Sequence, residues 1–500
     1  MIKKIFGPPG SGKTTFLLNT VEQELERGVS PNLIGYFAFT RRAALEAKER
    51  AAKKFTNLDV EKDFLWFRTL HSLAYSCLGV KNAEIMSAKD FKEFSKLAKL
   101  DLIVEKGEED FIVKTDNPIL NQINLARITG VDLKEHYNRS DIGISWWHFE
   151  YVERFYRKYK ERKQLFDFTD LLERLVENPE RVPELETVII DEAQDLSRLQ
   201  WDVVKILASK SKTTYVAGDD DQAIYVFAGA EVNEFLDLSG QVKVLNQSYR
   251  IPKKVYEMAT SIVKQIKKRQ EKEWKPKDSV GNINFVDNYF HINFEKGEWL
   301  ILSPTNYLLN PLHEYLLGQG VLFERNGQKS ISEKVLSVVL GWEALRKNKE
   351  VPFETVVDIY KYLDSSFVKR GHKNFKNSAK EEDVLYSLDK LKKDHGLLTD
   401  EIWHKALTKI PQMKRSYIVS LLRRGVKLRA KAPIRLSTIH GAKGSEADNV
   451  ILLTDLSTKF AKQISTNPDD MRRLLYVGVT RTKKNLYLVR PTDEEKSLLF

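Results

Sequence analysis

Cysteine is almost absent from this sequence, since Cys77 is the single one among 500 residues. One thiol excludes an internal disulfide and any metal site built from several cysteines. No uninterrupted apolar run approaches the roughly 18 residues that a membrane-spanning helix requires. A glycine-rich loop begins at Gly7, which leaves too few residues before it for a secretory leader with its cleavage site. We therefore expect a protein of the reducing cytoplasm with no membrane partner.

Low-complexity segments and internal repeats are also absent. Hydrophobic residues make up 42% and charged residues 30% of the chain, which is typical of globular proteins. Because a single hydrophobic core stops growing at about 250 to 300 residues, the length predicts two to four domains. The formal net charge of +11 favours an anionic partner such as nucleic acid, although many basic proteins bind none. Motifs must decide between these two interpretations.

A phosphate-binding loop stands near the start of the chain. Residues 3–6 predict a short strand, residues 15–26 predict a helix, and GPPGSGKT lies between them. Glycines let the backbone curl so that successive N–H groups face phosphates at the positive end of the helix. Lys13 is expected to contact the β- and γ-phosphates of ATP, and the Thr14 hydroxyl to ligate Mg²⁺. The expected ATP-binding residues of the loop are Gly7, Pro8, Pro9, Gly10, Ser11, Gly12, Lys13, Thr14 and Thr15.

Two acidic residues follow a second predicted strand. Residues 188–190 are β-branched and apolar, and Asp191 comes at their carboxyl end, where ligands bind in open α/β sheets. Asp191 is expected to hold Mg²⁺, directly or through water. Glu192 is placed to act as the general base toward the attacking water. A solvated turn is the alternative for an acidic pair alone, but the phosphate loop favours the catalytic interpretation.

A third predicted strand, residues 213–217, ends in GDDDQ. Gln222 could hydrogen-bond the γ-phosphate or the attacking water, and we count it as a catalytic candidate. The alternative is a polar turn without a catalytic role.

Nine motifs together resemble the UvrD/Rep-type superfamily 1 DNA helicases, and the resemblance covers nearly the whole chain. In the family's order they read GPPGSGKT, FAFTRRAA, FRTLHSLA, FDFTDLL, IIDEAQD, GDDDQAIYVFAGA, LNQSYR, STIHGAKGSE and RRLLYVGVTR. One short string can arise by chance, whereas nine in order do not.

The resemblance implies an α/β fold with two RecA-like P-loop NTPase domains, each with a parallel sheet and a mainly helical insertion, and with ATP in the cleft between the domains. The expected divisions are residues 1–245 for the first motor domain with an insertion at about 80–165, residues 246–330 and 431–500 for the second motor domain, and residues 331–430 for a helical accessory insertion. Within the second domain we expect strands at residues 283–286, 299–302 and 434–438.

Residues from the later motifs should complete the ATP site. Arg250 and Arg481 match the family's γ-phosphate arginines, which stabilise charge that develops during phosphoryl transfer. Tyr249 matches the aromatic residue that stacks on adenine, and Glu446 matches an acidic residue that approaches the ribose. Each arginine alone would more often be an ordinary surface residue.

The resemblance also implies a track for single-stranded DNA. The matching residues are Phe39, Thr40, Thr69, His71, Tyr225, Phe227, Asn306, Thr438 and His440. Aromatic rings stack on any base, at about 1 to 3 kcal/mol for each base, and a translocating enzyme needs that tolerance. Core packing is the usual alternative for an isolated phenylalanine. The two histidines lack the paired spacing of zinc ligands, so we expect no zinc site.

The helix predicted at about residues 144–163 is amphipathic, and we expect Trp146, Trp147 and Tyr159 in its core face. Its basic end, residues 157–163, could follow a DNA backbone, but a solvated face is the simpler interpretation. The charged run at 267–277 predicts a loop.

Three departures from the family pattern concern the sites. The adenine-reading glutamine segment that usually precedes the phosphate loop is not expected here, since the loop begins at Gly7. Thr15 stands where many relatives have arginine, and Phe227-Ala228 replaces a tryptophan-arginine pair. We also expect no fused nuclease after residue 500.

The family's activity gives the leading hypothesis, an ATP-dependent helicase that moves 3′ to 5′ on single-stranded DNA and unwinds duplexes. Its expected partners are single-stranded DNA, junctions with duplex and other replication or repair proteins, and the expected state is a monomer in the cytoplasm of a bacterium or an infected host cell. Two alternatives stay open, a translocase that displaces proteins without unwinding and a nucleotide-switched DNA clamp. RNA is a further possible track, because stacking reads neither sugar nor base closely.

Overall fold

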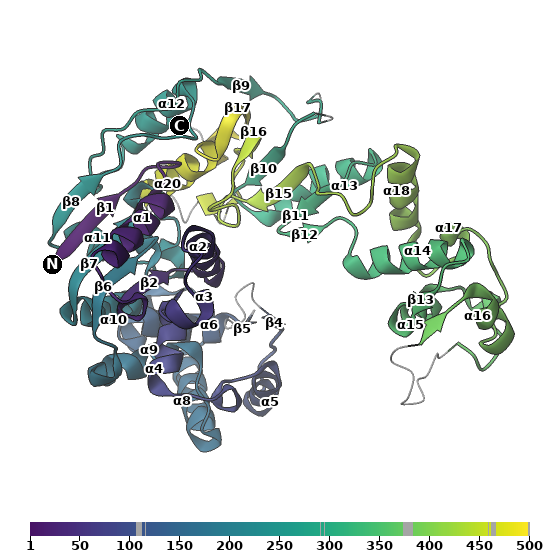
Figure 1. The fold of residues 1–500 in the computed structure, drawn as a ribbon, viewed down its shortest axis with the longest axis horizontal. Helices are drawn as coiled ribbons and strands as arrows, with labels where there is room; N and C mark the ends of the chain where they lie inside the picture. Colours follow the sequence, from purple (N-terminus) through teal and green to yellow (C-terminus); the bar gives the residue numbers. More distant parts are fainter. Residues whose placement is uncertain are drawn as a thin grey trace. The chain divides into compact units, whose positions relative to one another are not determined.

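The computed structural model describes residues 1–106, 113–115, 117–290, 292–294, 296–373, 384–458, 460–461 and 467–498. The chain divides into an N-terminal unit, Met1–Gly281 with Gln463–Thr480, and a C-terminal unit, Asn282–Lys462 with Arg481–Phe500. Each unit is built around its own sheet of mainly parallel strands (Figure 1). The α/β class with two parallel sheets is therefore confirmed.

The sheet of the N-terminal unit has six strands in the order β3-β2-β6-β7-β1-β8, and every pairing is parallel. The strands are β1 (Ile2–Phe6), β2 (Ile34–Ala38), β3 (Phe67–Thr69), β6 (Leu185–Ile190), β7 (Ser211–Gly218) and β8 (Gln241–Val244). The strands predicted at residues 3–6, 188–190 and 213–217 lie within β1, β6 and β7, as expected from their apolar, β-branched runs.

Helices cover both faces of this sheet, because successive strand residues point to opposite sides. Ile189 packs with α1 (Lys13–Glu26) and α2 (Arg41–Lys54), whereas Val188 and Ile190 pack with helices of the other face. The helices of that other face are α4 (Leu70–Leu78), α9 (Phe168–Glu177), α10 (Arg198–Ser209) and α11 (Val232–Asp237). The short α3 (Val60–Asp63) follows α2.

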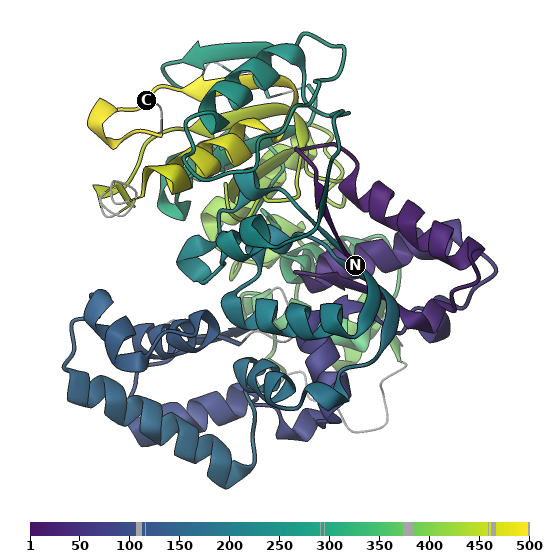
Figure 2. The ribbon, with the colours of Figure 1, turned by 90° about the vertical axis from the view of Figure 1, so that its left-hand side faces the viewer.

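In its described residues, the predicted insertion contains four helices and a pair of antiparallel strands. They are α5 (Ala88–Ala98), β4 (Val104–Lys106), β5 (Val113–Thr115), α6 (Pro118–Thr129), α7 (Leu133–Arg139) and α8 (Trp146–Lys163). These helices enclose an apolar core of their own around Phe94 and Phe149. Figure 2 shows them in blue tones, gathered at one end of the N-terminal unit. Residues 107–112 and 116 of the predicted insertion lie outside the described residues.

The long helix of this insertion corrects two expectations. Tyr159 is buried as predicted and Trp146 packs partly against the core, but Trp147 is 75% exposed, so its assignment to the core was wrong. The reason is position, because Trp147 lies on the outer side of α8, away from Phe149 and Val152, which are buried. The solvated basic end was wrong only for Lys160, which is buried among acidic side chains, whereas the other basic residues there are exposed as expected.

Residues 246–281 and 463–480 pack with the N-terminal unit. In this part α12 (Lys253–Val263) packs against α20 (Pro468–Val479), and the charged run at 267–277 forms neither helix nor strand, as predicted. The boundaries that we expect for the motor domains, at residues 245, 330 and 431, stay predictions.

The sheet of the C-terminal unit has seven strands in the order β12-β11-β15-β10-β16-β17-β9, and only the β11–β12 pairing is antiparallel. The strands are β9 (Asn282–Val286), β10 (Trp299–Ser303), β11 (Phe323–Arg325), β12 (Gln328–Lys329), β15 (Ile434–Thr438), β16 (Ala447–Leu453) and β17 (Thr482–Val489). The three strands predicted here, at residues 283–286, 299–302 and 434–438, are confirmed.

The region predicted as a helical accessory insertion is mainly helical in its described residues. Its elements are α14 (Glu333–Arg346), β13 (Val351–Pro352), α15 (Phe353–Tyr362), β14 (Leu385–Tyr386), α16 (Leu388–Asp394), α17 (Trp403–Ala406) and α18 (Gln412–Arg423), and α13 (Asn310–Gly318) precedes them. One apolar core joins these helices to the sheet. Residues 374–383 lie outside the described residues. Among the helices that are described, none is long and apolar enough to span a membrane.

Candidate nucleotide and nucleic-acid sites

The phosphate loop connects β1 to α1, as the sequence predicts. The Gly7 N–H donates to the Gly218 carbonyl at 3.0 Å, which holds the start of the loop against the end of β7. Gly10 and Gly12 have φ of 72° and 76°, in the left-handed region that favours glycine. Gly12 precedes α1, and no side chain caps the helix there. The first N–H groups of α1 are therefore directed toward the loop with no side-chain acceptor, which suits a phosphate anion.

The side chains of the loop also fit a phosphate group. Lys13 folds back over the loop, and its Nζ donates to the Gly7 carbonyl at 2.9 Å. The Ser11 hydroxyl is buried and, among the described residues, has no hydrogen-bond partner. A buried hydroxyl without a partner costs free energy that a bound phosphate oxygen would offset. The loop thus offers an ammonium, a hydroxyl and backbone N–H groups, and Thr14 and Thr15 follow in the first turn of α1.

The acidic pair follows β6 at the carboxyl end of the same sheet, as the phosphate loop follows β1. The Asp191 N–H donates to the Phe37 carbonyl at 2.9 Å, and its carboxylate accepts from the Tyr36 hydroxyl at 2.7 Å. Burial, and next the charge of Glu192, raise the pKa of Asp191 to about 6. No lysine or arginine forms an ion pair with Asp191 among the described residues. A buried carboxylate in this state fits a divalent cation, which would favour its ionised form.

Glu192 has an unusual backbone conformation that its sequence position did not reveal. Its φ of 54° lies in the left-handed region, which costs roughly 1 kcal/mol or more for a residue with a side chain. Its N–H donates to the Asp191 carboxylate at 2.9 Å, and its own carboxylate accepts from Gln194 Nε2 at 2.6 Å. Gln194 is fully buried and also accepts from the Asp219 N–H at 2.9 Å. Sequence analysis missed Gln194, which ties the loop after β6 to the loop after β7.

The aspartates that follow β7 form a closed ionic cluster. The Lys272 ammonium lies 3.0 Å from Asp219 and 2.8 Å from Asp221, and it also contacts Asp220. Arg269 donates to both carboxylate oxygens of Asp221, at 2.8 and 2.7 Å. Burial alone would lower the pKa of Lys272, but the three carboxylates outweigh it and raise that pKa. The carboxylate oxygens are close enough together to share a cation, and the lysine supplies it.

Gln222 lies at the edge of this cluster. It is buried, and its Nε2 donates to the Asp219 carboxylate at 2.7 Å. Arg473 of α20 donates to the Asp220 carbonyl at 3.1 Å and so joins α20 to the same loop. These contacts were not predicted, because Lys272 and Arg473 are far from the aspartates in the sequence.

The QSYR segment lies against the phosphate loop within the N-terminal unit. The Tyr249 N–H donates to the Gly10 carbonyl at 2.8 Å, and the Ser248 hydroxyl donates to the Pro9 carbonyl at 2.7 Å. A Cβ atom on Gly10 would lie 2.4 Å from the Cβ of Arg250, so only glycine permits this close approach. The Tyr249 ring is 74% exposed, which leaves its face available for a base. The structure thus brings Tyr249 and Arg250 to the loop.

Arg481 and Glu446 belong to the C-terminal unit. Arg481 is buried and donates to the Ser445 carbonyl at 3.5 Å, and the Glu446 carboxylate lies 3.7 Å from Lys483. Their approach to the nucleotide stays a prediction.

Three of the predicted DNA-contact residues form an aromatic patch in the N-terminal unit. The rings of Phe39 and Tyr225 stack with centroids 5.9 Å apart, and Tyr225 lies 6.4 Å from Phe227. Phe227 is 55% exposed, so core packing does not account for it, whereas Phe39 is partly buried against the core. These three residues are called the aromatic patch below.

The remaining candidates of this unit lie at helix starts. The hydroxyls of Thr40 and Thr69 accept from the backbone N–H groups of Ala43 and Ser72, and so they cap α2 and α4. His71 packs edge-on against Phe168 at 6.2 Å, and burial lowers the pKa of its imidazole to about 4. His71 is therefore neutral at physiological pH.

In the C-terminal unit, Asn306 and Thr438 follow two neighbouring parallel strands. Ser303 pairs with Thr438 across β10 and β15, and the Ile439 N–H donates to the Ser303 carbonyl at 2.9 Å. The Thr438 hydroxyl accepts from the Gly441 N–H at 3.0 Å, and His440 lies in the same turn. The structure thus places Asn306, Thr438 and His440 near the carboxyl ends of β10 and β15. Their contact with DNA stays a prediction.

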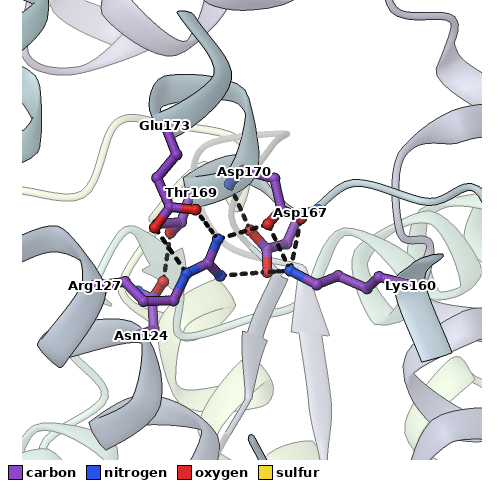
Figure 3. Close-up of polar contacts among 7 residues, drawn as sticks. All are labelled: Asn124, Arg127, Lys160, Asp167, Thr169, Asp170 and Glu173. Carbon is purple, nitrogen blue, oxygen red and sulfur yellow. Dashed lines mark hydrogen bonds and ion pairs between the residues drawn. The ribbon is translucent and has the colours of Figure 1, made fainter. Parts of the chain in front are cut away.

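A second ionic cluster, which sequence analysis missed, joins the insertion to the motif FDFTDLL. Arg127 of α6 donates to Asp167, Asp170 and Glu173, and Lys160 of α8 lies 2.6 Å from both aspartates (Figure 3). Burial alone would raise the pKa of Asp167, but the two cations outweigh it and hold that pKa well below its usual range. Asp167 and Asp170 also form a capping box at the start of α9.

Comparisons with known proteins identify the two domains of one helicase family in this chain. A family model described as UvrD/REP helicase N-terminal domain matches residues 3–243, and one described as UvrD-like helicase C-terminal domain matches residues 433–489. The ATP-dependent DNA helicase PcrA of Bacillus subtilis (strain 168) is 28% identical over 380 residues, which are 71% of this chain and 50% of that protein. The protein of the same name from Leuconostoc citreum is 26% identical over 382 residues, which are 72% and 50% of the two chains.

The chain spans about half the length of the curated relatives that it matches. Both family models describe domains of one family, and together they cover more than half of the 500 residues in the expected order. The chain therefore belongs to the UvrD/Rep family of helicases.

Proposed function

We propose that this protein is an ATP-dependent DNA helicase that translocates 3′ to 5′ on single-stranded DNA and unwinds duplexes. The observation that carries the proposal is the nucleotide site of the N-terminal unit. There Lys13 and the uncapped start of α1 follow β1, the carboxylates of Asp191 and Glu192 follow β6 of the same sheet, and the Tyr249 N–H is bonded to the loop. A site that only bound nucleotide would not require a base such as Glu192.

The proposed roles within this site follow from chemistry. Thr14 and Asp191 would hold Mg²⁺, which when bound neutralises charge on the phosphates. Glu192 would accept the proton of the attacking water, and the bond from Gln194 fixes its carboxylate for that task. Gln222 would orient the same water. Arg250, and in the complete site Arg481, would stabilise charge on the leaving phosphates.

The proposed grip on DNA uses residues of both units. The aromatic patch offers stacking faces to bases, at about 1 to 3 kcal/mol for each base. Asn306, Thr438 and His440 would contact the strand from the C-terminal unit. Gln194 joins the loop after β6 to the loop after β7, and the loop after β7 leads into Tyr225 and Phe227. Hydrolysis of the γ-phosphate could therefore move the aromatic patch through these few bonds.

The first experiment measures steady-state ATP hydrolysis with and without single-stranded DNA. The wild type is expected to be stimulated by DNA, and Glu192→Gln is expected to lose about 10²- to 10⁴-fold in kcat while it still binds ATP. Glu180→Gln is the matched control, because it makes the same chemical change at an exposed position. Hydrolysis that is indifferent to Glu192 would overturn the assignment of the base.

A second experiment separates the helicase from its alternatives. Forked duplexes with either a 3′ or a 5′ single-stranded tail are incubated with ATP, and strand separation is followed by fluorescence. Unwinding from the 3′ tail alone supports the proposal. Stimulated hydrolysis without unwinding would indicate a translocase, and binding without hydrolysis would indicate a clamp. Equal stimulation by an RNA strand would show that the protein does not distinguish RNA from DNA.

A further inference from the structure

A cavity of about 570 Å³ lies in the C-terminal unit, and none of the predicted site residues lines it. It is bounded by α13, by the β11–β12 hairpin and by the start of α18, which Figure 1 labels. Its volume is in the range of sites that hold small organic ligands.

The walls of the cavity combine apolar surface with cations. Leu317, Phe323 and the 66% exposed Met413 provide apolar surface, and Arg325, Lys329 and Lys414 provide positive charge. No acidic residue is among the lining residues, although Lys329 pairs with Glu333 at 2.7 Å. Lys414 is half-buried and has no acidic or hydrogen-bonding partner among the described residues. Such a combination suits a ligand with a flat apolar part and a negative part, as in a nucleotide.

The hairpin that forms one wall has a defined geometry. Asn326 and Gly327 make the turn between β11 and β12 with φ of 48° and 78°, and the Asn-Gly pair is typical of a two-residue turn with both central residues left-handed. The turn sets Arg325 opposite Gln328. The cations of this wall are therefore held by backbone pairing and not by a flexible loop.

The same hairpin is bonded to a residue of the proposed DNA track. Arg325 Nη2 donates to the Asn306 carbonyl at 2.7 Å, and Asn326 Nδ2 donates to the Asn306 side-chain oxygen at 2.9 Å. Arg325 also donates to the side chain of Asn310 at 2.7 Å. Tyr307, next to Asn306, is 51% exposed. A strand that touches Asn306 would thus pass close to the cavity mouth.

We propose that this cavity receives one nucleotide of the single strand, with its base on the apolar wall and its phosphate near Lys414. The proposal rests on the proposed function, since it extends the track of the C-terminal unit beyond Asn306. Its occupant is a nucleotide within a strand and not a free nucleotide, because the connection to Asn306 is what places nucleic acid there.

The test measures the affinity of the full-length protein for a fluorescent oligothymidylate at several salt concentrations. For a single strand, the slope of log affinity against log salt falls by about 0.7 for each phosphate contact that is lost. Lys414→Ala is expected to reduce the slope by about 0.7, so that its loss of affinity relative to the wild type is about threefold larger at 0.05 M salt than at 0.2 M. Lys414→Arg is expected to retain the slope. Lys361→Ala, which removes an exposed lysine from a surface ion pair, is the charge-matched control and should leave the slope unchanged.

A second readout locates the strand directly. An oligothymidylate that carries 5-iodouracil is cross-linked by light, and the modified peptide is identified by mass spectrometry. Cross-links within residues 323–330 or at Met413 support the proposal. Cross-links that are found elsewhere, together with an unchanged slope for Lys414→Ala, overturn the cavity assignment while DNA-stimulated hydrolysis persists.

The remaining outcomes separate this proposal from the proposed function. A wild type that neither binds nor responds to single strands would overturn both. Thymidine monophosphate that binds within tenfold of the oligonucleotide affinity, in a manner that depends on Lys414, would show that the occupant is a free nucleotide and would overturn the assignment to the strand.

Discussion

Two groups of carboxylates follow neighbouring parallel strands of the same sheet, yet they are neutralised in different ways. Asp219, Asp220 and Asp221, after β7, enclose the fully buried ammonium of Lys272. Asp191, after β6, receives only neutral donors, the Tyr36 hydroxyl and a backbone N–H group, among the described residues. The denser acidic group therefore carries its own cation, and the sparser one does not.

This difference shows that acid density is a poor guide to a metal site. Three carboxylates with oxygens close enough to share a cation would suggest a metal, but their positive partner is already a covalent part of the chain. Asp191 is buried with its pKa raised to about 6, so its ionised form is less favourable than that of an exposed aspartate, and a bound cation would offset this penalty. We infer that the Asp191 site is functional and that the aspartate cluster is structural.

The largest expected effect comes from removing the cation of the cluster. Lys272→Met leaves three buried carboxylates with Arg269 as their remaining side-chain cation, and breaking a buried ion pair in this way typically costs about 3–5 kcal/mol. The free energy of unfolding, measured with urea at pH 7, should fall by about that amount. Lys268→Met is the control, because Lys268 forms an exposed pair with Asp237 and should change little. Equal stability of the two variants would show that the cluster is not structural.

The next effect concerns Asp191, whose replacement should raise the free energy of unfolding. Because its pKa is raised by burial, the native state binds a proton more tightly than the unfolded state, so stability falls as pH rises from the ordinary aspartate pKa to about 6. Asp191→Asn removes this penalty and should stabilise the metal-free protein by about 1–3 kcal/mol at pH 8.

Urea unfolding at pH 8 and pH 4, without Mg²⁺, checks this sign. The gain in stability of Asp191→Asn should be present at pH 8 and absent at pH 4. At pH 4 the Asp191 carboxyl is protonated in the native state, so it carries no charge whose burial costs free energy. A loss of stability at pH 8 would mean that the carboxylate makes favourable contacts that outweigh its burial.

The local parts of both groups could be predicted from the sequence. The strand before Asp191 is a β-branched run, and the phosphate loop has glycines at fixed offsets, so short-range pattern was sufficient. The partner of the aspartates could not be predicted, because Lys272 lies in a charged run with no periodicity and reaches them only through the tertiary fold. The partners of Lys160 could not be predicted either, because only the tertiary fold brings Asp167 and Asp170 to this helix. The exposure of Trp147 depended on which side of α8 faces the core.

The smallest expected effect compares how Asp191 and the aspartate cluster contribute to Mg²⁺-dependent binding of ATP. If Asp191 helps to hold Mg²⁺, Asp191→Asn should reduce the gain in ATP affinity on adding Mg²⁺ by about tenfold. Asp220→Asn should leave that gain unchanged, because burial raises the pKa of Asp220 and its loss leaves two carboxylates facing Lys272 and Arg269 in balance. A fluorescent ATP analogue, titrated with and without Mg²⁺, measures both. The reverse result, in which the Asp220 variant loses the response and the Asp191 variant keeps it, would place the cation at the cluster and require Lys272 to move when nucleotide binds.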